Sequence, residues 1–149
     1  DNEFVKRVKE FAQQQGDEVV VISAKIESEL SELEDEDKKE FMKDLGLEET
    51  GLSQLIKKCF SLLGLQTYLT TGKKETRAWT IKKGMTGPQA AGVIHTDFER
   101  GYIRANIVSY EDFIQAGSLV KAREQGKLRQ EGKEYIMQEG DIVEFLFNV

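Results

Sequence analysis

Residues 78–105 decide the fold, and they read AWTIKKGMTGPQAAGVIHTDFERGYIRA. The pattern predicts a strand, a capped helix and a second strand in succession. Thr86 is the expected N-cap of the helix, with Gln89 three residues later to complete a capping box. Pro88 falls in the first helical turn, where its missing N–H costs nothing. We therefore expect the helix to begin directly after Thr86.

The apolar face and the end of this helix can also be predicted. Ala90, Ile94 and Phe98 recur at four-residue spacing and mark one apolar stripe. Gly101 stands where a left-handed C-cap would end the helix. Residues 103–107 then alternate like a half-buried strand. One helix, apolar on one side and ending at Gly101, is thus expected to lie across a sheet.

The preceding sequence supplies two more strands. Residues 67–71 and 76–80 read as strands joined through Gly72, Lys73 and Lys74, which predicts a hairpin.

The last third of the chain completes the sheet. A helical segment opens at Glu111, whose charge favours a helix N-terminus, and Gly117 is expected to interrupt it. Residues 135–138 and 142–147 are predicted to form a final hairpin. The side chains expected to face the core from its second strand are Val143, Phe145, Phe147 and Val149. The predicted result is a β-grasp domain, a mixed sheet with a helix laid across it.

The first 65 residues have a different pattern. Residues 3–15 predict a helix that stops at Gly16. Residues 19–22, VVVI, form a short β-branched run typical of a strand buried on both faces of a parallel sheet. Two short helices follow, the second closed by Gly46. Residues 52–63 then give the strongest helical periodicity of this half, so the half is expected to be mainly helical.

Composition places the chain among globular proteins, with 39% hydrophobic and 32% charged residues. No apolar run is long enough to span a bilayer, and the single cysteine excludes an intramolecular disulfide. Residues 1–65 carry 9 basic and 16 acidic side chains, whereas residues 66–149 carry 12 and 11. This asymmetry agrees with two domains, 1–65 and 66–149. We expect a cytoplasmic location and no membrane partner.

Several of these motifs resemble one family. Four stretches closely resemble the TGS domain of the YchF family. They are the residues around Trp79, the runs from Pro88 to Gly92 and from Ile94 to Gly101, and the C-terminal Phe-Leu-Phe-Asn-Val. Members of this family are Obg-related P-loop ATPases that associate with ribosomes. The resemblance implies an α+β chain in which a β-grasp TGS domain follows the helical tail of a P-loop nucleotide-binding α/β domain.

The resemblance also implies a site in the first half. Ser23, Ala24 and Lys25 would form the last nucleotide-base recognition loop, with backbone N–H groups reading the edge of the base. The sequence contains no Gly-x-x-x-x-Gly-Lys-Ser/Thr run. We therefore expect no catalytic residue and no cofactor in this chain alone. A full-length parent would hold ATP or GTP with Mg, and its remaining nucleotide-binding domain would be a partner of this chain.

Other chemistry is less well supported by the spacing. Ser23, His95 and Asp97 could suggest a nucleophilic triad, but two residues on one helix at this spacing point to different sides. The same spacing opposes a metal site at His95. The acidic residues 34–37 are expected to be a solvated helix boundary because they lack the pattern of a calcium loop. Cys59 is expected to be a buried, inert thiol.

A basic set on the first hairpin has two interpretations. It comprises Lys73, Lys74, Arg77, Lys82 and Lys83. The first interpretation is contact with ribosomal RNA phosphates, without DNA specificity. The alternative is a ubiquitin-like protein-interaction or intramolecular regulatory domain, with the charges merely solvated. Trp79 is expected to pack in or beside the core rather than to stack on a nucleobase.

Overall fold

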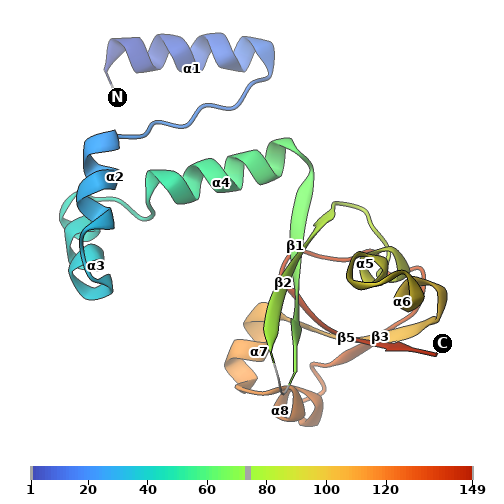
Figure 1. Ribbon diagram of the computed structural model, residues 1–149. Helices are drawn as coiled ribbons and strands as arrows, with labels where there is room; N and C mark the ends of the chain where they lie inside the picture. The colour runs from blue at the N-terminus through green and yellow to red at the C-terminus, as the bar shows by residue number, and fades with distance from the viewer. Residues whose placement is uncertain (1, 73–74, 149) are drawn as a thin grey trace. The chain divides into compact units, whose positions relative to one another are not determined.

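The computed structural model describes residues 2–72 and 75–148 (Figure 1). The chain divides into two compact units, residues 1–63 and 64–149. The N-terminal unit contains four helices: α1 (Glu3–Gln15), α2 (Ala24–Ser31), α3 (Asp35–Asp44) and α4 (Gly51–Leu62). The C-terminal unit contains β1 (Leu65–Thr71), β2 (Thr76–Lys82), α5 (Gly87–Ile94), α6 (Thr96–Arg100), β3 (Tyr102–Ser109), α7 (Tyr110–Ala116), α8 (Leu119–Glu124), β4 (Arg129–Glu131) and β5 (Asp141–Phe147). The chain is therefore an α+β protein, as predicted.

Local capping residues set the boundaries of the first helix. The Asn2 side chain accepts a hydrogen bond from the Val5 amide at 2.9 Å, which satisfies one donor of the first turn. Gly16 ends the helix with φ 75°, a left-handed conformation that glycine adopts without steric cost. The predicted helix over residues 3–15 is confirmed.

The predicted strand at residues 19–22 is wrong. No strand forms between α1 and α2, and Val21 and Ile22 are 49% and 41% exposed. The described part of the N-terminal unit contains no strand. Because an extended segment needs a neighbouring strand to satisfy its backbone groups, β-branched composition alone does not produce a strand here.

The C-terminal unit is built on one five-stranded mixed sheet with the order β2-β1-β5-β3-β4. The first hairpin pairs from Leu65 with Lys82 to Thr71 with Thr76, which confirms it as predicted. At the centre of the sheet β1 runs parallel to β5, and β5 runs antiparallel to β3. With α5 laid across it, this arrangement is a β-grasp fold.

The sheet has a separate apolar cluster on each face, and consecutive residues of β3 and of β5 point alternately into the two clusters. Tyr68, Ile107 and Val143 lie in the cluster beneath α5, with less than 4% exposure. Val108 and Ile142, adjacent in sequence to two of these, belong to the cluster beneath α7 and α8. Figure 1 shows α5 and α6 on one side of the sheet and α7 and α8 on the other.

The central helix begins as predicted but does not run to Gly101. The Thr86–Gln89 capping box is present, and the Thr86 amide donates to Gln89 Oε1 at 2.9 Å. His95 then adopts an extended conformation, with φ −161° and ψ 142°, and separates α5 from α6. Its Nδ1 accepts a hydrogen bond from the Asp97 amide at 3.2 Å, so His95 caps the second helix.

The predicted final hairpin is also wrong. Residues 135–138 form no strand, and Ile136 makes an isolated bridge to Thr86. The antiparallel neighbour of β3 on its outer side is instead β4, at residues 129–131, which the sequence analysis missed. Val143 is buried and Phe145 packs against the core as expected, but Phe147 is 37% exposed. Val149 lies outside the described residues.

Gly101 is required for a reason other than the one predicted. Its φ is −88°, outside the left-handed region, so it is not a left-handed C-cap. A Cβ atom at this position would instead lie 2.3 Å from the backbone oxygen of Asn148. The amide of Asn148 donates to Gly101 O at 2.9 Å. The glycine thus permits two backbone segments to touch at the end of β5.

We expect Gly101→Ala to lower the free energy of unfolding of the C-terminal unit by about 1–3 kcal/mol, because either backbone segment must move to admit the methyl group. Urea unfolding followed by the fluorescence of Trp79, the only tryptophan, measures this. Gly132→Ala is the matched control, since a Cβ there meets nothing within 4 Å. Equal unfolding midpoints for the two variants would contradict the proposed close contact.

Candidate functional site

The Ser23–Lys25 segment forms the first turn of α2. Ser23 is the N-cap, and its Oγ accepts from the Ile26 amide at 3.4 Å. Lys25 is exposed, with its Nζ 3.7 Å from Glu29 on the next turn. The N–H groups of a first helical turn have no intrahelical acceptor, and they can therefore donate to a ligand. The segment is thus an N-capped first helical turn on the surface of the N-terminal unit.

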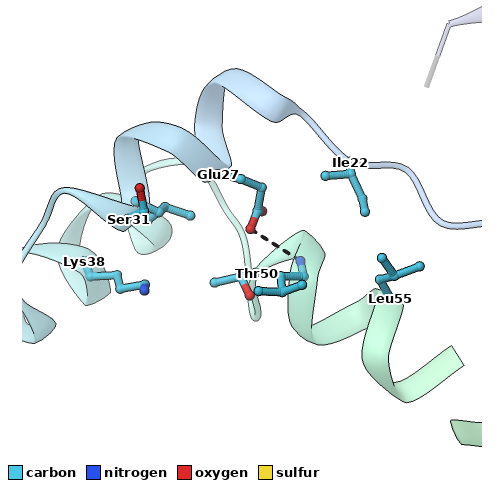
Figure 2. A pocket seen from close by; sticks show the side chains of 8 residues that line it. Ile22, Glu27, Ser31, Lys38, Thr50 and Leu55 are labelled. Atoms are coloured by element: carbon cyan, nitrogen blue, oxygen red, sulfur yellow. Dashed lines mark hydrogen bonds between the residues drawn. The ribbon is translucent and has the colours of Figure 1, made fainter. Parts of the chain in front are cut away.

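A carboxylate fixes the position of this turn within the N-terminal unit. Glu27 of α2 accepts a hydrogen bond from the backbone amide of Gly51 at 2.7 Å. It accepts a second from the amide of Leu52 at 3.3 Å, which is the dashed line in Figure 2. A negative charge at the N-terminus of α4 is favourable because it meets the positive end of the helix dipole. A Cβ at Gly51 would lie 2.9 Å from Glu27 Oε1 and 3.0 Å from Ile22. Glycine at position 51 thus admits the carboxylate.

The sequence analysis missed this interaction. Glu27 and Gly51 are 24 residues apart, and nothing in the local pattern links them. Thr50 supplies a second, local cap, because its Oγ1 accepts from the Ser53 amide at 3.1 Å. Beside these caps lies a largely apolar cavity of about 300 Å³ between α2, α3 and α4, and Figure 2 shows its lining side chains. They are Ile22, Glu27, Leu30, Ser31, Lys38, Thr50, Leu52 and Leu55.

The structure separates the described members of the first basic set. Lys73 and Lys74 lie outside the described residues. Arg77 pairs with Thr70 and Lys82 with Leu65, so they stand about 16 Å apart along β2 at about 3.3 Å per residue. They also point to opposite faces, since side chains alternate along a strand. Lys83 follows directly after Lys82, and both are exposed.

Trp79 is half-buried against the core, as expected. Its Nε1 donates to Thr70 Oγ1 at 2.9 Å, and the Arg77 guanidinium lies 4.1 Å from the ring centroid. One face of the ring therefore already carries a cation. The indole lines a groove together with Ile94, Phe98 and Phe145.

Basic side chains near β4 are held by acidic neighbours. Lys127 Nζ lies 3.0 Å from Asp112, and hydrogen bonding from this lysine lowers the pKa of that carboxyl. Arg129 lies 3.7 Å from the buried Asp141, whose pKa burial raises. Tyr135 donates to Asp141 at 2.9 Å, and burial raises the pKa of Tyr135 to about 12. Lys127 and Arg129 are thus engaged by acidic side chains of the same unit and are less available to a partner.

The expectations about the His95–Asp97 pair and about Cys59 can be compared with the structure. His95 and Asp97 do not point apart: His95 Nδ1 lies 3.5 Å from Asp97 Oδ2, because the helix breaks at His95. Cys59 is exposed rather than buried, since the described part of the N-terminal unit does not cover that face of α4.

Among residues 2–72 and 75–148, no group of three His, Cys, Asp or Glu side chains could hold a metal ion. No helix in these ranges is both long and apolar enough to cross a membrane.

The fold defines the C-terminal unit as a β-grasp domain, joined to a helical unit that carries a Ser-Ala-Lys turn. A family model, YchF-GTPase_C, described as "Protein of unknown function (DUF933)", matches residues 65–148. The chain belongs to the YchF family. Its resemblance to that family, read first from sequence motifs, is thereby confirmed.

Relatives in this family extend the similarity to the N-terminal unit. The Ribosome-binding ATPase YchF of Bacillus subtilis (strain 168) is 55% identical over 148 residues, which cover 99% of this chain and 40% of that protein. The protein of the same name from Haemophilus influenzae is also 55% identical, with 99% and 41% covered. The structure of the Schizosaccharomyces pombe YchF GTPase superposes with a TM-score of 0.82 at 35% identity, covering 97% of this chain and 39% of that one. The chain thus spans about 40% of the length of the curated relatives it matches.

We expect Glu27→Ala to destabilise the N-terminal unit by about 1–2 kcal/mol, because two amides of the first turn of α4 lose their acceptor. Thermal unfolding followed by circular dichroism at the helix band measures the loss. Glu29→Ala is the control, since Glu29 makes an exposed ion pair two residues further along α2. If both variants melt like the unsubstituted chain, the carboxylate does not hold α2 against α4.

Proposed function

We propose that this chain is the C-terminal part of a ribosome-associated nucleotide-binding ATPase or GTPase of the YchF type. The observation that carries the proposal is the 55% identity, over 99% of the chain, to a protein named ribosome-binding ATPase. The chain spans about 40% of that relative. ATP or GTP, with Mg, would be bound by the parent protein, in the cytoplasm.

Uncovered apolar side chains in the N-terminal unit support a missing neighbour. Phe4 and Phe11 of α1 are 75% and 65% exposed, and Leu62 of α4 is 71% exposed. Apolar helical faces of this kind are normally covered in a folded protein. We propose that residues 1–65 complete the nucleotide-binding domain of the parent. There residues 19–22 would find a strand partner, and the Ser23–Lys25 turn would read the base.

Residues 66–149 would act as the TGS domain that contacts the ribosome. Lys82 and Lys83 are exposed, and neither forms an ion pair within the described ranges. Lysines of this kind gain affinity for RNA by displacing counterions from phosphates. The nucleotide state of the parent would decide when this surface is presented. Because Arg77 lies at the other end of β2, we propose that the hairpin contacts RNA along its length rather than through one compact patch.

Charge reversal tests the ribosome proposal. We expect Lys82→Glu with Lys83→Glu, and separately Lys73→Glu with Lys74→Glu, to weaken co-sedimentation with ribosomes, because each pair exchanges attraction to phosphates for repulsion. The stability of the Lys82 and Lys83 variant should hardly change, since both lysines are exposed and exposed charges contribute little. The measurement is the bound fraction across a salt series, in which the unsubstituted chain should lose affinity steeply.

A control variant separates local contact from net charge. Lys121→Glu with Lys133→Glu makes the same change in net charge at exposed positions away from the hairpin, and it should sediment more like the unsubstituted chain. Binding that is insensitive to salt and to both hairpin variants would reject the RNA contact. That result would favour the protein-interaction interpretation of the domain.

Nucleotide binding by this chain alone is a separate test. We expect no micromolar affinity for ATP or GTP, because phosphate contacts and their metal dominate binding and catalysis in P-loop proteins and this sequence has no phosphate-binding loop. Isothermal titration calorimetry with Mg·ATP and Mg·GTP measures this. Micromolar binding at a single site would contradict the assignment of residues 1–65 to an incomplete nucleotide-binding domain.

A further inference from the structure

A second cavity lies in the C-terminal unit, on the face of the sheet opposite α5. Its volume is about 190 Å³, which suits a small metabolite rather than a drug-sized ligand. It is bounded by α8, by the chain leading into β4, and by the neighbouring strands β3 and β5. The lining residues are Asn106, Leu119, Val120, Arg123, Leu128 and Glu144.

Two opposite charges line this cavity without pairing to each other. Arg123 is exposed and forms no ion pair among the described residues. Glu144 accepts a hydrogen bond from Asn106 Nδ2 at 2.8 Å, and no described cation forms an ion pair with it. Arginine is suited to bind a carboxylate, and a glutamate carboxylate to bind an ammonium group. The two groups therefore match a ligand that carries both charges.

A buried polar atom belongs to the same lining. Asn106 is 5% exposed, and its Oδ1 has no hydrogen-bond partner within the described residues. A buried acceptor without a donor is costly, so such an atom is normally satisfied by the protein, by water or by a ligand. Asn106 donates through its Nδ2 to Glu144, so it holds that carboxylate in the lining of the cavity.

The remaining lining is aliphatic. Leu119, Val120 and Leu128 carry no polar side-chain atoms, and Val120 is 68% exposed. An apolar ligand group placed here would remove both its own surface and that of Val120 from water.

We propose that this cavity binds a free α-amino acid with an aliphatic side chain. The α-carboxylate binds Arg123, the α-ammonium donates to Glu144, which the Asn106 amide holds in place, and the aliphatic side chain packs on Leu119, Val120 and Leu128. A phosphate or a nucleotide would meet the Glu144 carboxylate, and an internal peptide segment carries neither of the two terminal charges. The site therefore selects a small zwitterion.

The test is an NMR titration of amide signals of the whole 149-residue chain. L-leucine, L-isoleucine and L-valine should give saturable shifts at α8, around Asn106 and around Glu144. L-leucinamide lacks the carboxylate and N-acetyl-L-leucine lacks the ammonium group, so each should bind about ten-fold more weakly or worse. Equal shifts with all three leucine compounds, or no saturable shift up to about 10 mM of the amino acids, would overturn the proposal.

Two substitutions identify which group binds which charge. Arg123→Gln should weaken L-leucine about ten-fold or more yet leave the weak binding of L-leucinamide unchanged. Glu144→Gln should weaken L-leucine similarly and leave N-acetyl-L-leucine unchanged. Lys121→Gln is the matched control on the same helix and should change nothing, since Lys121 is exposed and does not line the cavity. If Arg123→Gln and Lys121→Gln bind L-leucine equally, the assignment is wrong. Ribosomes play no part in this readout, so its outcome is independent of the proposed function.

Discussion

The C-terminal unit depends on the close packing of α5 against two tyrosine side chains of the sheet. Tyr68 is fully buried, and its hydroxyl donates to the backbone oxygen of Ala90 at 2.9 Å. Burial raises the pKa of Tyr102 to about 12, and its hydroxyl lies where a Cβ on Gly87 would come within 2.4 Å. Only small residues on this side of α5 allow the helix to approach so closely, and Ala90 and Ala91 are both fully buried. The capping box then fixes where the helix starts over the sheet.

The two units differ in how completely they bury their apolar side chains. The sheet of the C-terminal unit has a buried cluster on each face. Among the described residues of the N-terminal unit, Ala12, Leu30 and Gly51 are the buried ones, while Phe4, Val8 and Phe11 form an exposed stripe on α1. Hydrophobic burial provides most of the driving force for folding, so the N-terminal unit has much less of it available. This contrast supports our proposal that residues 1–65 belong to a larger domain.

Sequence patterns predicted the features that local chemistry controls. The capping box at Thr86, the glycine stop at Gly16, the first hairpin and the break at Gly117 all follow from residues within a few positions of one another. The errors arose where distant segments decide the outcome. Residues 19–22 lack a partner strand, and Gly101 is glycine because Asn148 touches it.

The candidate sites show the same division. The Ser-Ala-Lys turn was found from its resemblance to the family, but the Glu27 contact that positions it spans 24 residues. The basic set on the hairpin was visible in the sequence, yet the pairing of β1 with β2 was needed to place Arg77 and Lys82 at different ends. The cavity under α8 combines residues from 106 to 144, so no local motif could reveal it.

The central claim is that the C-terminal unit is a self-sufficient β-grasp domain, whereas the N-terminal unit is an incomplete part of another domain. Amide hydrogen exchange of the whole chain tests it most directly, because protection reports the free energy of local opening. We predict the slowest exchange in β3 and β5, and fast exchange through residues 17–23, with intermediate protection in α1 to α4. Protection of residues 17–23 and of α4 equal to that of β3 would contradict the account.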